Sequence, residues 1–68
     1  MNSNNLEKLK EKVLSSFKEK KFQEVIVDGE NLIKERQNDA QLLFLLGLAS
    51  INLQNFVSAE NYFEKLIL

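Results

Sequence analysis

Apolar residues recur every three or four positions along most of the chain, and polar residues separate them. This period is typical of amphipathic helices that bury one side. Polar residues interrupt the pattern at three places, Lys20-Lys21, Gln37–Asp39 and Gln54-Asn55. We therefore predict an all-α fold of four helices, over residues 6–18, 22–36, 40–53 and from 56 onwards.

The segment 40–53 differs from the other three because apolar residues cover nearly its whole circumference. A helix of this kind is buried on all sides, so we expect it at the centre of the fold. Gly29 stands inside the second helix, where glycine costs about 1 kcal/mol relative to alanine. We expect a neighbouring helix to approach closely at that point. The expected N-cap residues are Asn38 or Asp39 for the third helix and Ser3, Asn4 or Asn5 for the first.

The chain also matches itself at a spacing of 34 residues. The matched pairs include Phe22 with Phe56, Leu9 with Leu43, and Leu32 with Leu66. A fixed period of this size is typical of helical repeat arrays, in which each unit buries its apolar face against its neighbours. We predict a polar tail (1–5), a first unit (6–39) and a second unit (40–68). A four-helix bundle is the competing fold, since the same stripes and short loops permit it.

The second unit resembles a tetratricopeptide repeat in both of its helices. The residues that carry the resemblance are Leu43, Leu46 and Gly47 in the first helix, and Phe56, Ala59 and Phe63 in the second. The resemblance implies two tandem helical hairpins, a short α-solenoid, and assigns these six residues to the packing between helices. Gly47 and Ala59 are the small residues where the two helices of the unit cross, and the large residues fill the space around them.

The first unit departs from this pattern. Val13 stands where the second unit has Gly47, and Gly29 stands where it has Phe63, so small and large residues are exchanged. Lys12 takes the place of Leu46. We interpret the first unit as a degenerate repeat.

In tetratricopeptide arrays the first helices of successive units line a concave groove that binds peptides. The resemblance places an apolar strip in that groove, formed by Leu14, Phe17, Phe44, Leu48 and Ile51. Some relatives hold a peptide's terminal carboxylate with lysine and asparagine; Lys10 occupies one such place, but leucines stand where asparagine is needed. The strip therefore favours a non-catalytic protein-interaction module that binds an apolar helix or peptide, or a second copy of the chain.

Composition argues against most chemistry. The chain has no cysteine and no histidine, so it lacks thiolate ligands, disulfides and the commonest general base. We expect no cofactor, no metal and no enzymatic activity. A net charge of −1 gives no basic field for nucleic acid. The apolar stretch 40–53 is too short for a membrane span of about 20 residues, and no secretory signal is evident, which favours a cytoplasmic protein.

Two further interpretations remain open. The module could be the recognition arm of a larger enzyme, such as a transferase, whose catalytic domain lies beyond residue 68. It could instead be a structural unit that assembles with itself. The uncapped apolar face of Phe63, Leu66 and Ile67 favours a homodimer when the chain is studied alone.

Overall fold

The computed structural model describes residues 3–67, which form four helices joined by short turns. They are α1 (Ser3–Lys18), α2 (Phe22–Ile33), α3 (Ala40–Asn52) and α4 (Phe56–Ile67). The predicted all-α class and the four helices are confirmed. Three bounds differ from the prediction: α1 begins at Ser3, inside the predicted tail, α2 ends three residues early, at Ile33, and α3 ends one residue early, at Asn52. The three N-cap candidates at residues 3–5 therefore lie within α1, and the first two residues of the predicted tail lie outside the described part.

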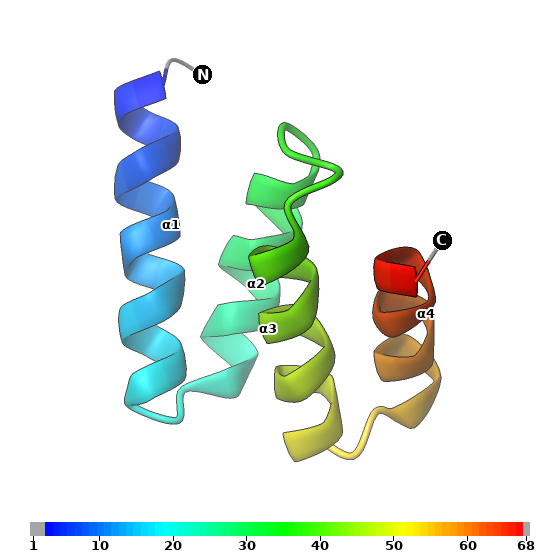
Figure 1. Cartoon of the computed structure of the whole chain (residues 1–68). Helices are drawn as coiled ribbons and strands as arrows, with labels where there is room; N and C mark the ends of the chain where they lie inside the picture. Colours follow the sequence, from blue (N-terminus) through cyan, green and yellow to red (C-terminus); the bar gives the residue numbers. More distant parts are fainter. Residues whose placement is uncertain (1–2, 68) are drawn as a thin grey trace.

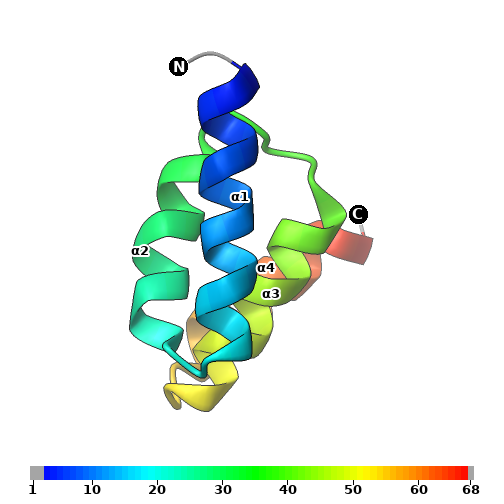
Figure 2. The same ribbon diagram turned by 90° about the vertical axis from the view of Figure 1, so that its left-hand side faces the viewer.

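The four helices lie side by side in the order of the chain, each antiparallel to the one before it (Figure 1). Each helix packs mainly against its neighbours in this row. In Figure 1, α1 and α4 lie at opposite ends of the row. Figure 2 views the row from the side of α1, so α1 is in front and α4 lies behind α3. The backbone fills a slab of 32 × 28 × 14 Å. A closed four-helix bundle would bring α1 against α4, so the arrangement is an open row.

The turns α1–α2 and α3–α4 share one backbone geometry. Lys20 and Gln54, 34 residues apart, both have a left-handed backbone, with φ of 63° and 62°. In each turn the N–H of the next residue donates to the carbonyl five residues back, over 2.8 Å in both cases. This bond ends a helix by satisfying one of its last carbonyls. The period seen in the sequence is therefore also present in the backbone.

The hydrophobic core lies where α1, α2 and α3 meet. Its fully buried side chains include Val13 of α1, Val25 and Leu32 of α2, and Leu42 and Leu46 of α3. Most of α3 is buried, in agreement with its apolar composition. The expectation that it is buried on all sides is wrong, because one side of α3 faces solvent.

The two hairpins are joined where α2 crosses α3. An ideal Cβ added to Gly29 of α2 would lie 2.5 Å from Cδ2 of Leu46. Such a separation is shorter than carbon atoms tolerate, so Leu46 occupies space that only glycine leaves open. The close approach expected at Gly29 is confirmed. The fully buried Leu46 thereby fixes the position of the second hairpin against the first.

We predict that Gly29→Ala destabilises less when Leu46 is shortened. In the wild type the added methyl group collides with Leu46, which should lower the free energy of unfolding by about 1 kcal/mol even after the gain in helix propensity. In Leu46→Val the Cδ2 methyl is gone but a carbon stays near the position of Cγ, 3.2 Å from the added methyl group, so the cost of Gly29→Ala should fall to about half or less. Urea unfolding followed by circular dichroism measures both. Equal effects in the two backgrounds would contradict the contact.

Candidate functional site

The structure places five of the six expected packing residues at the α3–α4 crossing or in the adjoining core. Leu43 and Ala59 are buried at 3% and 4% exposure, and Leu46 is fully buried against Gly29. A Cβ added to Gly47 would overlap the ring of Phe63. Phe56 differs, since 63% of its surface is exposed. It starts α4 but does not pack between the helices, because no neighbouring helix covers its side of α4.

The exchange of small and large residues in the first unit has a structural reason. Gly29 of α2 accepts Leu46 from the next unit, whereas Gly47 of α3 accepts Phe63 from its own unit. Lys12, at the position equivalent to Leu46, projects from α1 with an exposed side chain and forms an ion pair with Asp28 of α2 over 3.2 Å. The two units therefore use their glycines for different contacts.

The predicted groove strip divides into two parts. Leu14 and Phe17 of α1 are half-buried and pack against the core, and the Phe17 ring lies edge-on to Phe22 with a centroid distance of 5.6 Å. The second part is a stripe on α3 that consists of Phe44, Leu48 and Ile51, which we call the α3 stripe. Its end members, Phe44 and Ile51, are exposed at 49% and 41%. The exposed apolar surface of the predicted groove is therefore carried by α3.

Lys10, which the resemblance places in the groove, already has a partner. Its Nζ lies 2.7 Å from a carboxylate oxygen of Asp39, and most of both side chains is buried. The other carboxylate oxygen of Asp39 accepts the N–H of Leu42 over 3.0 Å and caps α3. Of the two N-cap candidates for this helix, Asp39 is the one observed. Lys10 thus holds the start of α3 and does not present a free ammonium for a carboxylate ligand.

The pKa of Asp39 reflects these contacts. Burial raises the pKa of this carboxyl, but the hydrogen bonds from Lys10 and from the Leu42 N–H, with the nearby charges of Lys10 and Arg36, hold it below its ordinary value. Arg36 itself pairs with Glu7 of α1 over 2.7 Å. The α2–α3 turn is therefore fixed to α1 by two ion pairs.

A second exposed apolar surface lies on α4. Phe56, Val57 and Ile67 are exposed at 63%, 75% and 84%. Phe63 lies half-buried between this surface and the α3 stripe, with its ring centroid 6.2 Å from that of Phe44. The sequence indicates an uncovered face of Phe63, Leu66 and Ile67; in the structure Phe63 and Leu66 are half-buried and Ile67 is exposed. The sequence does not indicate that Phe56 and Val57 extend the exposed surface. A hydrophobic pattern shows which residues are apolar, not which of them a neighbouring helix covers.

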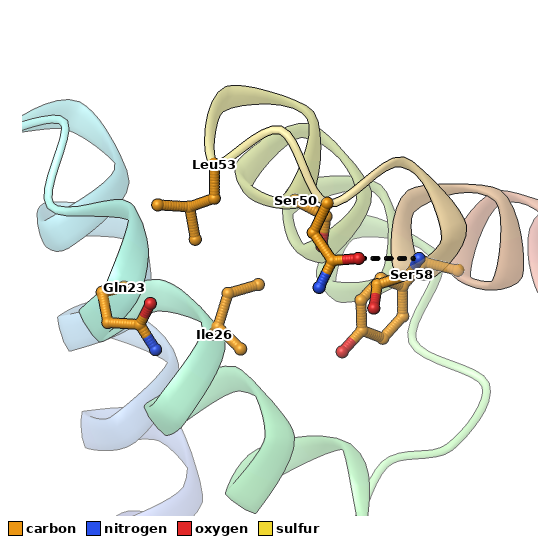
Figure 3. Close-up of a pocket in the computed structure, with 7 residues that line it drawn as sticks. Gln23, Ile26, Ser50, Leu53 and Ser58 are labelled. Carbon is orange, nitrogen blue, oxygen red and sulfur yellow. Dashed lines mark hydrogen bonds between the residues drawn. The ribbon is translucent and has the colours of Figure 1, made fainter.

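A cavity of about 280 Å³ opens between α2, the end of α3 and α4 (Figure 3). Its lining consists of Gln23, Ile26, Ser50, Leu53, Asn55, Ser58 and Tyr62. The Asn55 side chain accepts the N–H of Ser58 over 3.3 Å, and the buried Ser50 hydroxyl donates to the Leu46 carbonyl over 2.8 Å. None of these side chains is a carboxylate, an amine or an imidazole, so the lining contains no acid–base pair of the kind catalysis uses. Sequence analysis did not indicate this cavity.

Within residues 3–67, no three acidic side chains gather into a group that could hold a metal ion. None of the helices formed by these residues has the length and apolar content that crossing a membrane requires. Comparisons of the chain with family models, with curated proteins and with solved structures found no match. Only the surfaces described above therefore indicate what this chain binds.

We predict that the cap and the ion pair at Asp39 can be separated by substitution. Asp39→Ala removes both and should lower the free energy of unfolding at neutral pH by about 2 kcal/mol. Asp39→Asn keeps a capping oxygen and should cost about half as much. Urea unfolding measures both variants, with Glu35→Gln in the same turn as the control.

The pH dependence follows from the lowered pKa of Asp39. Because the pKa is lower in the folded state, the ionised carboxyl stabilises the fold fully above its unfolded pKa of about 3.9, and this stabilisation is lost as the pH falls through the folded value. The advantage of the wild type over Asp39→Asn should therefore shrink below about pH 4. An advantage that stays constant between neutral pH and about pH 2 would contradict the role of the charge.

Proposed function

We propose that this chain is a non-catalytic protein-interaction module of tetratricopeptide type that binds an apolar helix or peptide segment. The observation that carries the proposal is the α3 stripe. All other sides of α3 are packed against α2 and α4 or buried in the core, yet Phe44 and Ile51 are exposed on its free side. Large apolar residues that stay exposed beside a well-formed core are typical of an interface.

The spacing of the stripe favours a helical partner. Phe44, Leu48 and Ile51 follow one another at steps of four and three residues, so they form one line along α3. A partner helix with apolar residues at the same spacing could lie along it. Gln41 and Asn52 flank the stripe at its two ends and are exposed, and Asn52 donates to the Leu48 carbonyl over 2.9 Å. These neighbours are uncharged, so the proposed partner presents a neutral apolar side.

The absence of histidine and cysteine from the sequence supports a binding function over catalysis. It also supports a cytoplasmic location, where the chain would need no disulfide for stability. The repeated turn geometry, with its period of 34 residues, supports the tetratricopeptide interpretation.

The proposal predicts which surface captures helical peptides. A displayed library of amphipathic helices, with apolar residues at steps of four and three, should yield peptides that bind the wild type. Ile51→Lys should weaken their binding at least tenfold, a loss of about 1.4 kcal/mol, because it places a charge in the stripe. Val27→Lys is the matched control, since Val27 is exposed at 53% on α2. Peptides that bind Ile51→Lys as well as the wild type would contradict the proposal.

A further inference from the structure

The two ends of the helix row differ in polarity. Along α1, every exposed side chain from Asn4 to Lys18 is polar or charged. At the other end, Phe56 and Ile67 of α4 are exposed at 63% and 84%, and Val57 lies beside them. The exposed surface of α1 is therefore polar, whereas that of α4 combines large apolar side chains with polar ones.

The internal repeat shows that the exposed apolar residues of α4 correspond to residues of α2 that pack against the core. The α2 residues 34 positions earlier than Phe56 and Ile67 are Phe22 and Ile33. Both are half-buried and pack against the core that α3 completes. The same positions of α4 lack such a cover. We call the surface formed by Phe44, Phe56, Phe63 and Ile67 the end face.

The end face is not built to receive another helix of the α3 kind. Against the first unit, Leu46 of α3 packs into the space above Gly29, and the ion pair between Lys10 and Asp39 fixes the start of α3. The equivalents of Gly29 and Lys10 in the second unit are Phe63 and Phe44. An aromatic ring thus stands where α2 leaves open space above Gly29, and a second ring stands in place of the lysine. The centroids of the two rings are 6.2 Å apart. A following helix of the same kind would find no open space for its leucine and no lysine for its capping aspartate.

We propose that the end face binds the same face of a second copy, with α4 against α4 about a two-fold axis. This inference rests on the proposed function, because it names one partner of the module. The end face shares Phe44 with the α3 stripe but does not include Leu48 or Ile51. A head-to-tail contact would press the charged side of α1 against apolar rings, which leaves charges buried and unpaired. A face-to-face contact covers mainly apolar surface and brings in one carboxylate from each copy, that of Glu60, whereas head-to-tail stacking would cover the many charged side chains of α1. It also closes at two copies.

The geometry of α4 suits a two-fold contact. Phe56, Glu60, Phe63 and Ile67 follow one another at steps of four, three and four residues and share one side of the helix. Antiparallel pairing brings Phe56 of one copy opposite Ile67 of the other and places the two Phe63 rings near the axis. Glu60 lies near the axis as well, where Ile26 stands in α2. The two carboxylates weaken the contact through their mutual repulsion.

The size of the end face indicates a weak dimer. With Phe44, Phe56 and Ile67 exposed at 49%, 63% and 84% and Phe63 half-buried, each copy offers on the order of 400 Å² of apolar surface, within the range of patches that mark interfaces. Two copies would bury on the order of 800 Å², which is the size of a weak, transient interface. We therefore expect a dissociation constant on the order of 10 μM.

Sedimentation equilibrium of the 68-residue chain, run from well below to well above that concentration, tests the proposal. The wild type should reach the mass of a dimer and go no higher. Ile67→Lys should weaken the dimer at least tenfold, because Ile67 lies at the edge of the contact, and should leave the helicity unchanged, because the side chain is exposed. Glu60→Ile should tighten it severalfold. Val27→Lys and Ile51→Lys should leave the dissociation constant unchanged.

Three results would overturn the proposal. The first is a wild type that stays monomeric at all concentrations, in which case another protein or further chain covers the end face. The second is a mass that grows beyond the dimer, as head-to-tail stacking predicts. The third is a dimer that tolerates Ile67→Lys but is lost in Ile51→Lys. A monomeric chain that still binds helical peptides through Ile51 overturns the dimer alone, and a dimer that binds no such peptide overturns the peptide-binding function alone.

Discussion

The insertion of Leu46 above Gly29 is the contact on which the rest of the structure depends. It is the place where the second hairpin meets the first, and the fully buried leucine packs into space that a side chain at position 29 would fill. The ion pair of Lys10 with Asp39 fixes the start of α3 beside it. Because α3 is held on one side of the first hairpin, the row extends sideways (Figure 1) and does not close into a bundle. An open row leaves parts of α3 and α4 without a neighbouring helix, and apolar residues remain exposed there.

The two ends became different through single positions of the repeat. Lys12 of α1 stands where α3 has Leu46, so the first end projects a solvated charge that pairs with Asp28. Phe63 of α4 stands where α2 has Gly29. Its ring fills the α3–α4 crossing above Gly47, and α4 has no glycine that would leave space for a further helix. These exchanges accompany a polar surface on α1 and a surface with large exposed apolar residues on α4. The module therefore presents apolar surface on the free side of α3 and on α4.

The sequence predicted the features that depend on local pattern. The four helices follow from stripes of apolar residues, the breaks from short polar runs, and the close approach at Gly29 from the cost of glycine inside a helix. It did not predict features that depend on which side of a helix is covered. Phe17 was expected in the groove but packs on Phe22 at the edge of the core, and Phe56 was expected between helices but faces solvent. The pairing of Lys10 with Asp39, 29 positions away, depends on tertiary structure and leaves no mark in a local pattern.

The most direct test of the open row is a nuclear Overhauser spectrum of the isotope-labelled chain, recorded at a concentration below that of any self-association. The open row predicts contacts between the Leu46 methyl groups and the Hα protons of Gly29, and none between α1 and α4. Contacts between side chains of α1 and α4, or no contact between Leu46 and Gly29, would show a closed bundle and contradict the arrangement from which both proposed surfaces follow.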